Sequence, residues 1–222
     1  MIDFSLLQYF EYFRPGNPHQ MAAIQRLQEE LPEQLKAEDA AWREAWAASG
    51  MEQWVLTPYF TQIDNPIQPM RECFTSAAAM VAAKYRRVSS DVEYAWDLKS
   101  HGDTTKVEAH IKTLRSYDLD VTFRKDGTPE MLEQEIRAGR PVLVGWLHHG
   151  PIDKPTGFGH WSVIVGYNRD EFIMHDPAGE PNMLEGGHIN GGGRDYRVNR
   201  RQFLERWEIE GKATGWMIVV KD

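Results

Sequence analysis

The hydrophobic pattern of this chain changes once, from helical spacing in its first part to strand-like runs in its last part. Between residues 19 and 31, apolar side chains recur at three- and four-residue intervals, which predicts an amphipathic helix. Pro32 restarts the chain, and residues 32–48 are typical of a second helix. We therefore expect residues 1–50 to form an N-terminal helical segment and residues 51–222 to form the main domain.

The main domain is predicted to place helices before most of its strands. The run that begins at Cys73 is apolar all round, which is typical of a buried helix. A near-continuous apolar run from Pro141 to His148 predicts a central strand covered on both faces. The other expected elements are helices over 91–98, 128–139 and 200–207, a helix introduced by residues 102–105 and ending at 117, and strands over 53–56, 119–124, 159–167, 171–175 and 215–220. This order indicates an α+β fold with a mostly antiparallel sheet.

Composition narrows the function classes. The 222 residues include 25 Lys and Arg against 33 Asp and Glu, a formal charge of −8, which argues against a nucleic-acid or anionic-membrane binder. One cysteine permits no intramolecular disulfide and no metal site of paired cysteines. The N-terminus lacks the features of a signal peptide, and no run approaches the ~20 apolar residues of a membrane span. We expect a protein folded in the cytoplasm, without a membrane span.

The single cysteine, Cys73, stands at the predicted start of the buried helix. A lone cysteine is often only a small buried hydrophobe. At a helix N-terminus, however, unpaired backbone N–H groups and the positive end of the dipole stabilise thiolate over thiol. This position suits a nucleophile.

A predicted hairpin supplies a base for that nucleophile. If residues 168–170 form the turn, strand pairing places Asp176 opposite Trp161 or Ser162, within a residue or two of His160. A histidine beside a carboxylate is the base and its orienting partner in a nucleophilic triad. An alternative uses His160, Asp176 and either His148 or His149 as zinc ligands, but no His-Glu-x-x-His spacing supports it.

The other histidines and two glutamines complete the set of candidates. His148 and His149 end the preceding strand and could lie near the same site, whereas His101, His110 and His188 have no evident carboxylate partner in a paired strand. A thiol hydrolase also needs a donor for the oxyanion, usually the backbone N–H of the nucleophile and a side-chain amide from the loop before it. Gln62 and Gln68 both lie in that loop.

Five tracts in this order resemble the papain-like cysteine peptidases of family C39 and their C39-like relatives. They are residues 59–64, 73–80, 139–142, 159–167 and 175–177, within a stretch that spans roughly residues 54–180. The resemblance implies a papain-like fold with Cys73 as nucleophile, His160 as base, Asp176 as orienting residue and Gln62 as oxyanion donor. It implies no cofactor.

The sequence departs from the members that trim peptide leaders, which usually carry glycine after the cysteine and are fused to a transporter. Here Phe74 follows Cys73. The stand-alone form is more similar to C39-like enzymes of phage and bacterial genomes. We therefore expect a peptidoglycan hydrolase, an endopeptidase or amidase of the phage-lysin type that a separate pore would release to the wall. The alternatives are an intracellular protease or peptide-processing enzyme that acts on a protein, and a catalytically inactive binding module.

Overall fold

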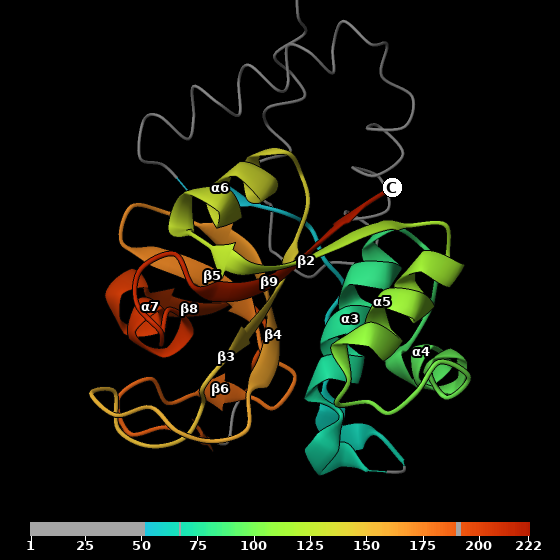
Figure 1. Cartoon of the computed structure of the whole chain (residues 1–222), viewed down its shortest axis with the longest axis horizontal. Helices are drawn as coiled ribbons and strands as arrows, with labels where there is room; N and C mark the ends of the chain where they lie inside the picture. Colours follow the sequence, from blue (N-terminus) through green and yellow to red (C-terminus); the bar gives the residue numbers. More distant parts are fainter. Residues whose placement is uncertain (1–51, 67, 190–191) are drawn as a thin grey trace, which may run out of the picture. The chain divides into compact units, whose positions relative to one another are not determined.

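The computed structural model describes residues 52–66, 68–189 and 192–222 (Figure 1). The predicted N-terminal helical segment, residues 1–50, lies outside the described residues. The helices are α3 (Cys73–Lys84), α4 (Asp91–Leu98), α5 (Val107–Ser116), α6 (Pro129–Arg137) and α7 (Arg200–Trp207), with the short 3-10 helices η2 (Gln62–Asp64) and η3 (Pro69–Arg71). None of the described helices is long and apolar enough to cross a membrane.

The strands form one large antiparallel sheet and a small two-stranded one. The large sheet has the order β2 (Asp120–Gly127), β9 (Gly215–Lys221), β3 (Val142–Trp146), β4 (His160–Tyr167), β5 (Glu171–His175) and β8 (Tyr196–Asn199), and β1 (Gln53–Trp54) pairs with β4. β6 (Glu180–Pro181) and β7 (His188–Ile189) make the small sheet. Strand β4 therefore lies in the middle of the large sheet, and it carries His160 at its start.

Helices cover both faces of this sheet, with α3, α4 and α5 grouped on one side (Figure 1). Val163 and Val165 of β4 pack against these helices, while Ile164 between them packs in a second cluster with residues of α6 and α7. All of β4 is buried, as expected for a central strand. The mixture of helices and antiparallel sheet confirms the predicted α+β class.

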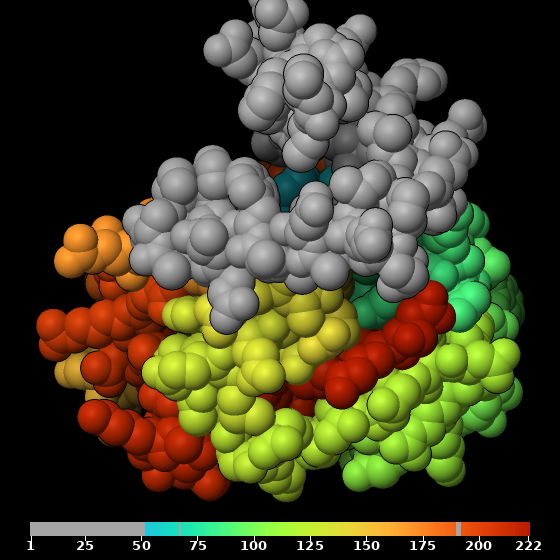
Figure 2. All heavy atoms as spheres, turned by 90° about the horizontal axis from the view of Figure 1, so that it is seen from above, coloured from blue at the N-terminus to red at the C-terminus, as the bar shows by residue number. Residues whose placement is uncertain are grey.

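Helix α3 is buried along most of its length, from Phe74 to Ala82, and begins at Cys73 as the sequence predicts. Its alanines let the helix backbone approach the sheet closely, because a methyl side chain occupies little space between them. The last residues of β9 lie at the surface beside these helices (Figure 2, red). Asp222, which follows β9, forms an ion pair with Arg87.

Several predicted boundaries were wrong for identifiable reasons. The helix expected after residues 102–105 begins only at Val107, because the Asp103 carboxylate accepts hydrogen bonds from Thr105 N and Oγ1 and holds a turn. The strand expected over 141–148 ends at Trp146, since Leu147 N donates to Arg206 O outside the sheet. The strand expected over 119–124 continues to residue 127, past an irregularity in its pairing with β9.

Strand β8 was not predicted. Of its four residues only Val198 is fully buried, so its sequence carries almost no hydrophobic signal. Pairing with β5 makes it a strand.

Candidate active site

The first feature of the site is the thiol of Cys73 at the start of α3. Its side chain is half-buried. Burial by itself raises the pKa of Cys73, but the charge of His160, a hydrogen bond to that residue and a hydrogen bond from the Trp161 backbone bring it below its ordinary value of 9.0. Cys73 therefore ionises more readily than an ordinary thiol.

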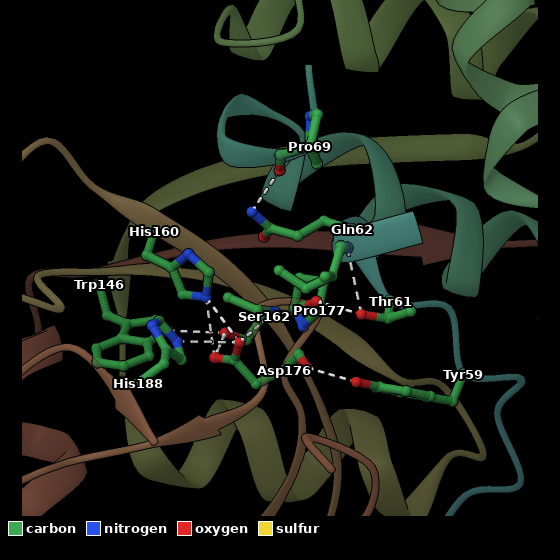
Figure 3. A network of polar contacts seen from close by, with 12 residues as sticks. Tyr59, Thr61, Gln62, Pro69, Trp146, His160, Ser162, Asp176, Pro177 and His188 are labelled. Carbon is green, nitrogen blue, oxygen red and sulfur yellow. Dashed lines mark hydrogen bonds and ion pairs between the residues drawn. The ribbon is translucent and has the colours of Figure 1, made fainter. Parts of the chain in front are cut away.

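The second feature is a buried histidine–carboxylate pair. His160 and Asp176 are 3% and 0% exposed, and His160 Nε2 lies 2.9 Å from both Oδ1 and Oδ2 of Asp176 (Figure 3). Burial favours the neutral imidazole, but the charges of Asp176 and Cys73 and the hydrogen bonds to both raise the pKa of His160 to about 10. Because Nε2 is held by Asp176, Nδ1 is the nitrogen left to exchange a proton with the thiol.

The hairpin prediction accounts for this pair. β4 ends at Tyr167 and β5 begins at Glu171, so the turn consists of residues 168–170 as expected. Val163 pairs with His175, and the same register continued by one residue sets Asp176 opposite Ser162.

Two donors besides His160 hydrogen-bond to the Asp176 carboxylate, and a third polar group, His188, lies beside it. Ser162 Oγ donates to Oδ2 at 2.8 Å, and Ala178 N donates to Oδ1 at 2.9 Å. The Ser162 hydroxyl in turn accepts from Trp146 Nε1 at 2.9 Å, so its one proton is directed at Asp176. Burial opposes the charge, but His160 and then His188 keep the pKa of Asp176 well below its ordinary 3.8. The carboxylate is therefore ionised at neutral pH.

His188 is the third group, and sequence analysis missed it. Its Nε2 lies 3.1 Å from Asp176 Oδ1, although it is not aligned for a hydrogen bond with any described residue. His188 belongs to the two-residue strand β7 in the glycine-rich segment, so strand pairing with His160 gave no signal for it. We found no evident carboxylate partner for His188 in a paired strand, and Asp176 indeed lies outside the strand that pairs with β7.

His148 also lies near the site, as the sequence suggested. Its ring centroid is 4.9 Å from that of His160 and 5.6 Å from that of His188. Burial and the positive charges of neighbouring histidines lower the pKa of His148 to about 3, so it is neutral in this cluster. Among the described residues, the donor atoms that could together hold a metal ion belong to His160, Asp176 and His188, and lie within 4.8 Å of one another. This set has His188 in the place where the sequence alternative had His148 or His149.

The two candidate glutamines, Gln62 and Gln68, differ in exposure and in hydrogen bonding. Gln68 is exposed, and its Oε1 accepts from Arg71 Nη1 at 2.7 Å. Gln62 is 4% exposed; its Nε2 donates to Pro69 O at 2.7 Å, and its Oε1 has no hydrogen-bond partner among the described residues. Of the two glutamines, only Gln62 is buried beside the polar network of Figure 3.

The loop that carries Gln62 is tied directly to the residues around Asp176. Gln62 N donates to Pro177 O at 2.9 Å, Thr61 Oγ1 donates to the same oxygen at 3.1 Å, and Tyr59 Oη donates to Asp176 O at 3.0 Å (Figure 3). The chain before the nucleophile and the chain after β5 are therefore held together.

The glycine-rich segment approaches the site through its backbone. Asp176 N donates to Gly193 O at 2.7 Å, and a Cβ on Gly193 would lie 1.9 Å from Asp176 O. Gly186, at φ +83°, also packs closely on Gly150, since a Cβ there would lie 2.6 Å from Gly150 O. At these two positions glycine permits close backbone contact.

Comparisons with known proteins agree with this architecture. Residues 56–214 match the sequence model of the Peptidase_C39 like family. A C39-like peptidase from Bacillus anthracis is similar in structure, with a TM-score of 0.55 and 15% identity over 77% of this chain and 98% of that chain. A double glycine motif protease from an AMS/PCAT transporter, solved in complex with the leader peptide, gives a TM-score of 0.50 and 20% identity over 76% and 94%. No curated protein matches this chain.

Proposed function

This chain belongs to the Peptidase_C39 like family of cysteine peptidases, and on that premise we propose that it hydrolyses an amide bond of a peptide with Cys73 as the nucleophile. The observation that carries the proposal is the buried His160–Asp176 pair beside a thiol of lowered pKa. An ordinary buried cysteine needs no such partners. Arrangements that shift the pKa of a thiol and a histidine in opposite directions are typical of active sites.

In the proposed reaction the Cys73 thiolate attacks the carbonyl carbon, a C–S bond forms, and the carbonyl π electrons move to oxygen. The backbone N–H of Cys73 and the side-chain amide of Gln62 donate hydrogen bonds to this oxyanion. When the oxygen reforms the carbonyl, the C–N bond breaks and the His160 imidazolium protonates the leaving amine. Water, deprotonated by His160, then attacks the thioester and releases the acid and the thiol.

Asp176 has a supporting role in this proposal. It accepts from His160 Nε2, which keeps Nδ1 directed at the sulfur and stabilises the imidazolium. Ser162 and Ala178 hold the carboxylate by two further hydrogen bonds. The carboxylate stays charged throughout, because its pKa lies far below neutral pH.

For the substrate, we propose a polypeptide segment as the first class to test. The structurally similar double glycine motif protease was solved with a leader peptide, which supports a peptide chain as the ligand of this fold. The narrower hypothesis of a peptidoglycan stem peptide rests on Phe74, which stands where leader-trimming members carry glycine. Both substrates contain the amide bond that the proposed chemistry cleaves.

Release of new amino groups separates the possibilities. The protein, Cys73→Ala and His160→Ala are each incubated with a denatured protein mixture and with purified bacterial cell walls. We expect release by the unchanged protein only, from one of the two substrates, and product mass then names the bond. Slow alkylation of Cys73 at neutral pH, together with no release from either substrate, would instead identify an inactive binding module.

A further inference from the structure

The residues that directly follow the nucleophile and the base are stacked on one another. The rings of Phe74 and Trp161 have centroids 4.0 Å apart and an interplanar angle of 9°. Both side chains are buried, with 1% and 7% exposure. Phe74 follows Cys73 on α3 and Trp161 follows His160 on β4, so this contact joins the two elements next to the proposed reacting groups.

The sheet supports the stack from the Trp161 side. Gly145 of β3 pairs directly with Trp161, and a Cβ on Gly145 would lie 3.1 Å from the indole ring. The missing side chain therefore leaves room for the indole. Trp161 is enclosed between this backbone and the ring of Phe74, and it cannot retreat into the sheet.

A buried histidine supports the stack from the Phe74 side. The His110 ring lies 3.6 Å from that of Phe74, at 20°. Its Nε2 donates to Thr104 O at 2.7 Å, which leaves Nδ1 to accept from Tyr94 Oη at 3.1 Å. Both bonds suit the neutral imidazole, and burial lowers the pKa of His110 to about 4. This ring is therefore fixed in one tautomer and one orientation.

Thr104 joins this support to the first turn of α3. Its Oγ1 lies 2.5 Å from Thr75 Oγ1, within the same turn that carries Cys73. The two residues after the nucleophile are thus both held, Phe74 between two flat rings and Thr75 by a hydroxyl contact. Close-packed rings of this kind cannot move closer without a steric clash or slide apart without opening a void.

We propose that the Phe74–Trp161 stack sets the separation between the Cys73 sulfur and the His160 imidazole, which makes Phe74 and Trp161 positioning residues for the reaction. The inference rests on the proposed function. If a substitution removes one ring from the stack, the start of α3 can move relative to β4. The thiolate and the imidazolium then lose alignment, even though neither group has been altered.

The test is the alkylation of Cys73 by iodoacetamide as a function of pH, in full-length Phe74→Leu. We expect the thiol pKa to rise by about one unit, which lowers the alkylation rate below that pKa about tenfold. If the separation changes by about 1 Å, kcat on the substrate identified above should fall by up to about a hundredfold. An unchanged alkylation profile in a folded Phe74→Leu would overturn the inference.

Phe203→Leu is the matched control. Phe203 is fully buried and stacks on Trp207 with centroids 5.4 Å apart, but in the core cluster on the other face of the sheet. We expect it to lose stability as Phe74→Leu does and to keep the wild-type alkylation profile. An equal shift in both variants would mean that any core ring has this effect, which contradicts a specific positioning role.

A second pair of variants covers the case in which Phe74→Leu does not fold. Trp161→Phe keeps a flat ring in the stack, whereas Trp161→Leu removes it. The inference expects Trp161→Phe to stay close to the wild-type profile and Trp161→Leu to shift it; identical profiles would contradict it. Failure of the proposed function itself has a different signature, an ordinary thiol titration in the wild-type protein.

Discussion

Replacing Ser162 by alanine removes the hydroxyl that connects Trp146 to the carboxylate of Asp176. Ser162 is completely buried, donates to Asp176 Oδ2 at 2.8 Å and accepts from Trp146 Nε1 at 2.9 Å. Ser162→Ala therefore leaves a buried indole N–H unpaired and a buried charge with one donor fewer.

The expected loss of stability follows from these two contacts. An unsatisfied buried donor costs about 1–3 kcal/mol, and a hydrogen bond to a charged group contributes about 1.5–3 kcal/mol. We therefore expect the free energy of unfolding at pH 7 to fall by roughly 3 kcal/mol or more in Ser162→Ala. The assay is denaturant unfolding, followed by the pH dependence of Cys73 alkylation.

The pH dependence distinguishes a role in the site from a role in stability alone. Loss of the Ser162 donor raises the pKa of Asp176, but the carboxylate stays ionised at neutral pH. It also removes one of the bonds that fix the orientation of the carboxylate, so the bond to the imidazolium loses alignment and weakens. The pKa of His160, about 10 in the wild type, should therefore fall. The alkaline limit of the thiolate–imidazolium pair, which is the pH above which the imidazolium loses its proton, should move to lower pH with it.

Ser76→Ala is the matched control, because Ser76 makes the same contacts elsewhere. Its Oγ donates to Asp91 Oδ2 at 2.6 Å and accepts from Asn65 Nδ2 at 3.0 Å, and the side chain is completely buried. We expect a similar loss of stability without a change in the alkylation profile. If Ser162→Ala and Ser76→Ala give the same alkaline limit as the wild type, the hydroxyl does not act on the His160–Asp176 pair and the reasoning is refuted.

Three further predictions concern Asp176, Arg206 and Gly193. Asp176→Asn should bring the pKa of His160 down from about 10. Because the pKa of Asp176 lies below its ordinary 3.8, the carboxylate stabilises the fold above pH 3.8, and the wild type should lose that stability as pH falls through the acid range whereas the variant should not. Curves of unfolding free energy against pH that run parallel in acid for the two proteins would count against this. Arg206→Leu removes the buried guanidinium that donates to the carbonyls of residues 147, 149, 150 and 183, and should cost about 3 kcal/mol or more in denaturant unfolding; a loss under about 1 kcal/mol would show that water replaces those bonds. Gly193→Ala should lower kcat at least tenfold, because its Cβ would meet Asp176 O at 1.9 Å. In the control Gly187→Ala the Cβ would meet nothing within 4 Å, so kcat should be kept despite the φ of +78°. Equal kcat values in the two variants would contradict the close contact at Gly193.

Local patterns were sufficient to predict the elements that carry the site. The alanine-rich run after Cys73 predicts a buried helix that starts at the thiol, and α3 begins there. The apolar strands on either side of residues 168–170 predict a hairpin, and its turn length fixes which residue faces Asp176. Both inferences need only the spacing within a continuous stretch of about twenty residues.

The contacts between distant segments could not be predicted in this way. Trp146 reaches Ser162 because β3 and β4 are neighbours in the sheet, and His188 reaches Asp176 from a two-residue strand. The stack of Phe74 on Trp161 depends on how α3 lies against β4. Hydrophobic periodicity records which side of an element is buried, but not which side chain of another element it meets.

The orientation of Gln62 is a further example. Gln62 and Gln68 lie six residues apart in one loop, and only the family resemblance favoured Gln62. The backbone bond from Gln62 to Pro177 buries the first, and the contact with Arg71 keeps the second at the surface. Neither partner can be identified before the fold is known.

The most direct test of the account is the titration of Cys73 in the wild-type protein and in His160→Ala, by iodoacetamide alkylation from pH 4 to pH 11. We predict a wild-type thiolate that persists below the ordinary pKa of 9.0, and a profile in His160→Ala that moves to 9.0 or above, because burial then acts without the imidazolium. The same profile in both proteins, with a pKa near 9.0, would contradict the thiolate–imidazolium pair on which the proposed peptidase mechanism depends.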